Sequence, residues 1–307
     1  MTQPAAREWA AEGIGFEVRD GVAWLTLNRP DKRNAVDYPM RTALLAAIEE
    51  VRDDPGIRAA VVTGAGTAFC AGADIRGRDP IEVSPERRRG DHAVLAREDG
   101  RRFGWWRVIK AVWENEKPFV AAVNGPAYGF GCNFALACDL VIAAESATFC
   151  EVFVQRGLPL EALGAYVLAR SLSPVRAREL ALLGDPITGA QAAEWGLANR
   201  CVPDAELAEA AGGLAARLAS GPSIAIGNIK SQLNDAYDAS IEQAWKNEVT
   251  LLGVGAGADG AEARKAFAER RPPRYTGRLS PRPAVSGNNP RERAPLTLRN
   301  VFLPDAP

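Results

Sequence analysis

Histidine is almost missing from this chain of 307 residues, because His92 is the only one. The five cysteines form no Cys-x-x-Cys pair, so a zinc site is not expected. A serine–histidine–acid triad is not expected either, since no Gly-x-Ser-x-Gly segment is present. The cysteines are odd in number and lie mostly inside apolar segments, which is typical of reduced, buried cysteines in a cytoplasmic protein.

Strong charge and long apolar runs are missing as well. The formal net charge is -1, which gives no reason to expect nucleic acid or an anionic membrane as a partner. No apolar run approaches the roughly 20 residues that a membrane span needs. The segment Met1 to Ala11 lacks the basic-then-apolar pattern of a secretory signal. We therefore expect a cytoplasmic protein with no nucleic-acid and no membrane partner.

The common nucleotide-binding motifs are absent. Thr63-Gly64-Ala65-Gly66 could begin a dinucleotide-binding turn, but Phe69 stands where the third glycine is needed. No helical pattern begins at once after it, and the chain has no Gly-Lys-Ser/Thr triplet of a P-loop. The sequence therefore has neither a dinucleotide-binding fingerprint nor a P-loop.

The hydrophobic pattern indicates strands alternating with helices and then a run of helices. Gly15–Arg19 and Val22–Asn28 are expected to form a hairpin around Asp20-Gly21. Ser173 and Thr188 are expected to cap helices at their N-termini. Further strands are expected at 59–63, 119–123 and 140–143, and helices at 38–52, 105–113, 130–138, 204–220, 221–253 and 260–271. This order predicts an α/β core followed by an α-helical C-terminal part.

Two segments differ from the rest in composition. Arg76 to Gly104 is rich in charge and weakly periodic, so we expect either a solvated surface excursion or a flap beside a site. Pro272 to Pro307 is rich in Pro and Arg with almost no periodicity, which is typical of an extended arm.

Two stretches of small residues each follow an expected buried strand. Thr67 to Asp74 follows the strand at 59–63, and Asn124 to Asn133 follows the strand at 119–123. Small residues let a ligand approach the backbone closely. We expect each turn to aim one backbone N–H at the same point, where the pair would polarise a carbonyl group.

Five segments, in chain order, carry a family pattern: Leu27-Asn28-Arg29-Pro30-Asp31-Lys32-Arg33-Asn34-Ala35, Ala68–Asp74, Lys117–Asp139, Ile187–Leu197 and Ala266–Pro272. They resemble the crotonase (enoyl-CoA hydratase/isomerase) superfamily, and the resemblance covers Gly15 to Tyr275. It implies a crotonase-type ββα superhelix core over 1–200. It also implies an α-helical C-terminal trimerisation part over 201–271, which leaves 272–307 as an extended arm outside the pattern.

The resemblance implies an acyl-CoA substrate, no cofactor beyond the CoA thioester, and a homotrimer or hexamer. The thioester oxygen would lie between the backbone N–H groups of Ala73 and Phe130. The loop from Arg29 to Asn34 would meet the CoA phosphates, with Lys32 among its cations. The positions that the resemblance assigns to substrate binding are Arg33, Ala35, Ala71, Asp74, Ile75, Asn133, Phe153 and His92.

The chain departs from the family at its acid and base positions. The two glutamates with which hydratases of this family add water fall on Asn133 and Phe153, and neither side chain exchanges protons near neutral pH. Glu161 remains, in a segment where several isomerases and dehalogenases of the family carry an Asp. A surface or helix-capping role is its alternative. Glu151 is a weaker candidate, because its phase relative to Phe153 turns it elsewhere.

One carboxylate suffices to move a proton between the α and γ carbons of an enoyl-CoA. The favoured interpretation is therefore an enoyl-CoA isomerase with Glu161 as the base. Three alternatives stay open. The first is a hydrolytic or dehalogenase-like enzyme in which Glu161 attacks and His92 activates water. The others are a hydratase with atypical residues and an acyl-CoA binder without catalysis.

Overall fold

The computed structural model describes residue 9 and residues 11–74, 104–254 and 257–277. The chain forms two compact units that divide between Gly221 and Pro222. Within the described residues, none of the helices is both long and apolar enough to span a bilayer.

The first unit is built on a six-stranded sheet with the order β1-β2-β3-β4-β6-β9. β1 and β2 are antiparallel, and the other neighbours are parallel. Asp20 and Gly21 join β1 to β2 with positive φ at both residues, as a two-residue hairpin turn requires, so the expected hairpin is confirmed. The strands are β1 (Ile14–Arg19), β2 (Val22–Leu27), β3 (Ala59–Gly64), β4 (Phe119–Val123), β6 (Leu140–Ala144) and β9 (Arg200–Val202).

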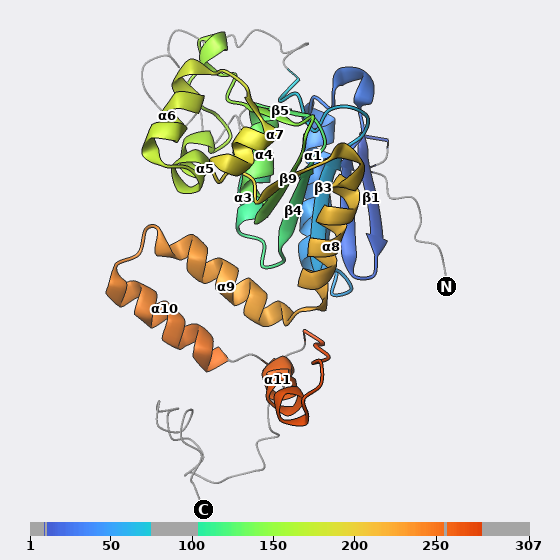
Figure 1. Ribbon diagram of the computed structural model, residues 1–307, viewed down its shortest axis with the longest axis vertical. Coiled ribbons are helices and arrows are strands. Elements are labelled where there is room, and N and C mark those ends of the chain that lie inside the picture. Colours follow the sequence, from blue (N-terminus) through green and yellow to red (C-terminus); the bar gives the residue numbers. More distant parts are fainter. Residues whose placement is uncertain (1–8, 10, 75–103, 255–256, 278–307) are drawn as a thin grey trace, which may run out of the picture. The chain divides into compact units, whose positions relative to one another are not determined.

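Helices cover both faces of this sheet (Figure 1). α1 (Tyr38–Asp53) and α3 (Trp105–Trp113) each connect one strand to its parallel neighbour, and α4 (Phe130–Ala137) lies between β4 and β6. Because the strand order advances in one direction and such crossovers are right-handed, these helices lie on the same face. The opposite face is covered by α8 (Leu207–Ser220), which packs against β2, β3, β4 and β6.

A second, three-stranded sheet extends the first unit. It has the order β5-β7-β8, with β5 (Pro126–Tyr128), β7 (Thr148–Cys150) and β8 (Ile187–Thr188). Ser173 and Thr188 cap α6 (Pro174–Leu183) and α7 (Gly189–Glu194) by accepting hydrogen bonds from Arg176 N and Gln191 N, so both expected caps are confirmed. The remaining elements of the unit are η2 (Pro30–Lys32), η3 (Val154–Arg156), α5 (Gly164–Ser171), α6 (Pro174–Leu183), α7 (Gly189–Glu194) and η4 (Asp204–Glu206).

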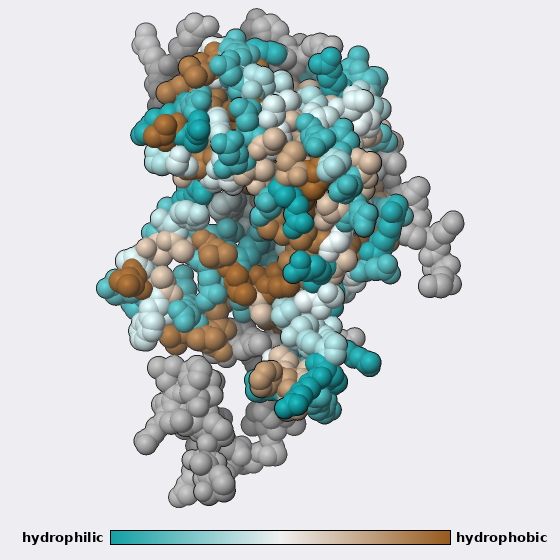
Figure 2. Space-filling view, in the orientation of Figure 1, coloured by the Kyte–Doolittle hydropathy of each residue, from teal (hydrophilic) through white to brown (hydrophobic). Residues whose placement is uncertain are grey.

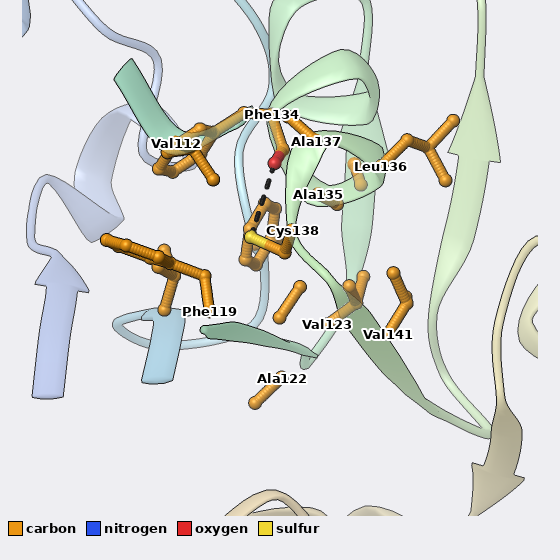
Figure 3. Close-up of a cluster of buried hydrophobic side chains, with 14 of the residues drawn as sticks. Val112, Phe119, Ala122, Val123, Phe134, Ala135, Leu136, Ala137, Cys138 and Val141 are labelled. Atoms are coloured by element: carbon orange, nitrogen blue, oxygen red, sulfur yellow. Dashed lines mark hydrogen bonds between the residues drawn. The ribbon is translucent and has the colours of Figure 1, made fainter. Parts of the chain in front are cut away.

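The core lies between the sheet and the helices α1, α3 and α4. Figure 3 shows side chains of α4, such as Phe134 and Leu136, together with Phe119 of β4 and Val112 of α3. Every residue of β4 and of α4 is buried. β4 is an apolar strand buried on both faces, and α4 is a helix buried on all sides. This packing fixes the position of the first residue of α4, which is Phe130.

The second unit contains α9 (Ser223–Ala236), α10 (Ile241–Val254) and α11 (Gly257–Glu269). The expectation of one helical stretch over 221–253 is wrong, because the chain leaves the helix at Tyr237 and starts α10 after Ser240. The Ser240 hydroxyl accepts a hydrogen bond from Gln243 N at 3.2 Å and so caps α10. The division into 1–200, 201–271 and 272–307 stays a proposal. α8, which falls in the second of these ranges, packs on the sheet of the first unit.

Candidate active site

Two turns that are far apart in sequence are joined by backbone hydrogen bonds. Cys70 N–H donates to Pro126 O at 3.0 Å, and Tyr128 N–H donates to Cys70 O at 2.9 Å. The bonds form a parallel bridge between Cys70 and Ala127. They therefore place the Thr67–Asp74 turn directly beside the turn that leads into α4.

Glycines allow this close approach. A Cβ atom on Gly125 would lie 2.1 Å from Thr67 O, and one on Gly131 would lie 2.3 Å from Cys70 O. No side chain fits at such distances, so both positions need glycine. A Cβ on Gly72 would lie 3.0 Å from Tyr128 O and 4.0 Å from Phe130 N. The backbone around Gly72 therefore lies only a few ångströms from the start of α4.

The geometry leaves one backbone donor free in each turn. Val36 bridges to Ala73 by accepting from Asp74 N and donating to Gly72 O, so the N–H of Ala73 itself points to the other side. Phe130 is the first residue of α4, and a first helical N–H has no acceptor inside its own helix. Across the described ranges neither N–H has a hydrogen-bond acceptor. Two backbone donors without acceptors in neighbouring turns are one requirement of an oxyanion hole.

Both donors line a cavity of about 560 Å³. It also contains Glu161, so the structure brings the three expected catalytic positions together. Asn133 is not among the described lining residues, and Ile75 and His92 lie outside the described residues. Of the expected substrate-binding positions, those that line the cavity are Arg33, Ala35, Ala71, Asp74 and Phe153.

The charged end of the cavity is formed by the loop of η2. Lys32 and Arg33 line the cavity, and Arg33 O accepts a hydrogen bond from Ala71 N at 2.9 Å. Arg29, the third cation expected near phosphates, has another place. Its guanidinium pairs with Asp37 at 3.0 Å and Asp74 at 3.5 Å, so it ties the loop to the first turn.

Asn34 and Asn124 hold these loops, a role that the sequence analysis does not predict. The Asn34 side chain accepts from Arg29 N at 2.9 Å and donates to Ala65 O and Ala68 O at 2.9 and 2.7 Å. Asn34 also has φ of 56°, a conformation that asparagine tolerates better than most residues. Asn124 accepts from Gly64 N and donates to Gly64 O. An asparagine directly after a buried strand was the available signal.

Glu161 lies in a strained turn. The two following residues, Ala162 and Leu163, both have positive φ, at 51° and 58°. The backbone oxygen of Glu161 accepts hydrogen bonds from Gly164 N at 2.9 Å and from the Asn133 amide nitrogen at 3.0 Å. Its half-buried side chain lines the cavity. Asn133 therefore holds the backbone of the segment that presents the Glu161 carboxylate.

The apolar wall of the cavity is aromatic. Trp105 and Phe130 have ring centroids 5.1 Å apart, and Phe130 stacks on Phe134 at 5.8 Å. Phe153 lies so close that a Cβ on Gly129 would be 3.5 Å from its ring. The Phe130 side chain is thus part of the core as well as of the cavity wall, while its backbone supplies the donor.

Glu151 is buried outside this cavity. Its side chain has no exposed surface, and burial raises its pKa to about 8.

In the part of the chain that the structure describes, no group of three or more His, Cys, Asp or Glu side chains could hold a metal ion. The described carboxylates that line the cavity of the two N–H donors are Glu161, Asp31 and Asp74.

The comparisons with known proteins agree with this geometry. The family profile described as Enoyl-CoA hydratase/isomerase matches residues 17–278. The chain is 37% identical over 268 residues to a "Probable enoyl-CoA hydratase" of Rhodobacter capsulatus, covering 86% of this chain and 98% of the relative. It is 36% identical over 270 residues to the 1,2-epoxyphenylacetyl-CoA isomerase of Escherichia coli K12, covering 87% of this chain and 99% of the relative.

The fold agrees as well. The crystal structure of an enoyl-CoA hydratase from Polaromonas sp. JS666 superposes with a TM-score of 0.74 at 30% identity, covering 85% of this chain and 99% of that one. The chain belongs to the crotonase (enoyl-CoA hydratase/isomerase) superfamily and has its mixed α/β fold with C-terminal helices. It is an acyl-CoA enzyme of that family.

Proposed function

We propose that this enzyme isomerises an unsaturated acyl-CoA by moving a proton through an enolate. The N–H groups of Ala73 and Phe130 bind the thioester oxygen, and Glu161 takes the proton from one carbon and returns it to another. The chemistry needs one base and a stabilised oxyanion. It does not need a second acid to activate water.

One observation carries the proposal: Glu161 lines the same cavity as Ala73 and Phe130, whose backbone N–H donors lack acceptors. Of the other two carboxylates that line it, Asp31 and Asp74, the second pairs with Arg29. As charge develops on the thioester oxygen, each donor of this kind contributes about 3 kcal/mol of transition-state stabilisation. Asn133 is turned to the backbone of Glu161, and Phe153 offers only an aromatic ring. The side chains present thus support proton transfer better than two-carboxylate hydration. One relative with an isomerase name is 36% identical, which agrees with this reading.

The CoA part would lie at the charged end. Lys32 and Arg33 flank the cavity mouth, and phosphate oxygens are strong partners for such cations. The acyl part would lie against the rings of Trp105, Phe130 and Phe153. This orientation puts the thioester between the two ends, where the free N–H groups are.

The test is direct turnover. Wild-type enzyme mixed with a 3-enoyl-CoA should form the conjugated 2-enoyl-CoA, followed by the absorbance of the conjugated thioester. Glu161→Gln should lower kcat by roughly 100-fold or more, because it removes the base and keeps the shape. Glu179→Gln is the matched control, since Glu179 is an exposed carboxylate of α6 paired with Arg176 at 2.7 Å. An unchanged rate in Glu161→Gln would remove Glu161 from the mechanism.

Product analysis separates the alternatives in the same experiment. A 3-hydroxyacyl-CoA product would indicate hydration. Free CoA, or halide from a halogenated aryl-CoA, would indicate hydrolytic chemistry with Glu161 as the nucleophile. The isomerase proposal requires that the conjugated enoyl-CoA is the main product and that neither free CoA nor halide is released.

We also propose that the chain assembles as a homotrimer or hexamer through its second unit. Apolar side chains gather on α9 and α10 in Figure 2, and such exposed apolar surface commonly marks an interface. Light scattering should therefore give a trimer or hexamer, and Ile241→Asp should weaken it while Gln243→Asp does not. A monomer at micromolar concentration would contradict the proposal. The exposed large apolar residues of these helices are Ile229 and Leu233 on α9, Tyr237 directly after it, and Ile241, Trp245 and Leu252 on α10.

We further propose a cytoplasmic location. The five cysteines are all free, and four of them are buried. Free buried thiols are typical of reducing compartments. Fluorescent tagging at the C-terminus would test the location, and a secreted product would contradict it.

A further inference from the structure

Glu151 is a buried carboxyl group that the proposed reaction does not use. It directly follows β7 and has 0% exposed surface. Neither of its oxygens has a hydrogen bond among the residues described. The polar group that faces it is the thiol of Cys132, a weak donor. Burial of a carboxyl group without good partners is costly, so such a group needs an explanation.

The position of Glu151 connects it to the oxyanion hole. Cys150, the residue before it, accepts the hydrogen bond from Gly129 N at 2.9 Å. Gly129 is the N-cap of α4 and has φ of 52°, so this bond holds the residue that directly precedes Phe130. Cys132, which faces the carboxyl, is the third residue of the same helix. Glu151 therefore lies beside the first turn of α4, the helix whose first N–H is the Phe130 donor.

Two negative charges would compete at this turn. A helix N-terminus stabilises one nearby anion, and in the reaction that anion is the thioester oxyanion. An ionised Glu151 would be a second anion in a buried place, and like charges at short range disfavour each other. The groups facing this region are the thiols of Cys132 and Cys150 and, near Cys150, the carboxylate of Asp185. None of these can neutralise a carboxylate.

We propose that Glu151 is a positioning residue of the oxyanion hole that works only in its protonated form. As a neutral group it fills the space behind the first turn of α4 and leaves the positive end of that helix to the substrate oxyanion. When it loses its proton, the oxyanion hole weakens. The proposal rests on the proposed function only through the oxyanion hole, and not through Glu161. Burial keeps the group protonated at neutral pH, because it raises the pKa to about 8.

The test uses a ligand whose acyl part does not titrate. Cinnamoyl-CoA is conjugated with its carbonyl, so its absorbance shifts to the red when that carbonyl is polarised. For the wild-type enzyme we expect a red shift at neutral pH that falls by about half as the pH passes about 8. Glu151→Gln, which is neutral at every pH, should keep the shift on both sides of that value. Glu179→Gln should behave as the wild type.

The outcomes separate two failures. If wild-type enzyme gives no red shift at any pH, the oxyanion hole itself is wrong, and with it the proposed function. If the shift is present and Glu151→Gln shows the same pH dependence as the wild type, the Glu151 proposal alone is wrong. The wild type gives a further measurement that needs no variant. Its infrared spectrum should show a protonated carboxyl band at pH 7 that is absent from a Glu151→Gln sample, and absence of that band from the wild type would overturn the proposal.

Discussion

The side-chain amide of Asn133 donates a hydrogen bond of 3.0 Å to the backbone oxygen of Glu161. Asn133 is fully buried, and the resemblance to the family assigns its position to one of the glutamates of the hydratases. Asn133 thus has a structural role in this protein: its side chain holds the backbone of the segment that carries Glu161. The bond joins residues 28 positions apart, on α4 and before α5.

Removing this bond should affect both stability and catalysis. Asn133→Ala leaves Glu161 O with Gly164 N as its other partner and opens space beside Gly164. We expect a loss of about 1–3 kcal/mol in the free energy of unfolding. We also expect a fall of roughly tenfold in kcat, because the carboxylate is no longer held in place. Urea denaturation and steady-state kinetics measure the two effects, and a variant with unchanged kcat would show that the bond does not position Glu161.

The close approach of the two turns predicts a severe effect of one methyl group. In Gly131→Ala the new Cβ would lie 2.3 Å from Cys70 O, so the start of α4 must move. We expect activity to fall below one hundredth of the wild type, since both N–H donors depend on this contact. Gly213→Ala is the control: it lies in α8 with nothing within 4 Å of its Cβ and should stabilise the protein by about 0.5–1 kcal/mol. Equal activities for the two variants would contradict the geometry.

Lys32 should contribute to binding rather than to chemistry. It lines the charged end of the cavity, so Lys32→Ala should raise KM for an acyl-CoA about tenfold and leave kcat unchanged. The effect should vanish with an acyl-pantetheine thioester, which lacks the nucleotide phosphates. Lys110→Ala is the control, since Lys110 lies on α3 and pairs with Glu114 at 3.3 Å. A similar rise in KM for the pantetheine substrate would place Lys32 elsewhere than at the phosphates.

Parts of the fold and of the site were predictable from the sequence because their signals are local. Asp20-Gly21, the caps at Ser173 and Thr188, and the strand-then-small-residue turns depend on a few neighbouring residues each. The partners of Arg29 and Asn133 were not predictable, because Arg29 reaches Asp74 across 45 positions and Asn133 reaches Glu161 across 28. Only the folded backbone decides such contacts.

The break between α9 and α10 was missed for another reason. The helical pattern of apolar residues continues through Tyr237, so periodicity alone gives no end signal. Ser240 followed by Ile241 was a usable sign of a helix start. The sequence contained no sign that Glu151 is buried. Its spacing from Phe153 indicated that the two side chains point in different directions, but spacing does not indicate how deeply a side chain is buried.

The free energy of unfolding should depend on pH because of Glu151. Below pH 4.5, the ordinary pKa of a glutamate, Glu151 is protonated in both the folded and the unfolded chain. Above that pH, Glu151 ionises in the unfolded chain. In the folded chain it keeps its proton until the pH reaches its raised pKa of about 8. The wild type should therefore lose free energy of unfolding relative to Glu151→Gln as the pH rises through this window. The slope should reach about 1.4 kcal/mol per pH unit. Urea denaturation of both proteins gives the difference, and a constant difference across the window would contradict the buried, protonated carboxyl.

The most direct test of the proton transfer is hydrogen exchange into the substrate. In D2O, wild-type enzyme with an enoyl-CoA should place deuterium on the carbons between which the proton moves, and mass spectrometry would follow it. Glu161→Gln should slow this incorporation by roughly 100-fold or more while still binding the thioester, because the oxyanion hole is backbone. Incorporation at the wild-type rate in Glu161→Gln would contradict the account.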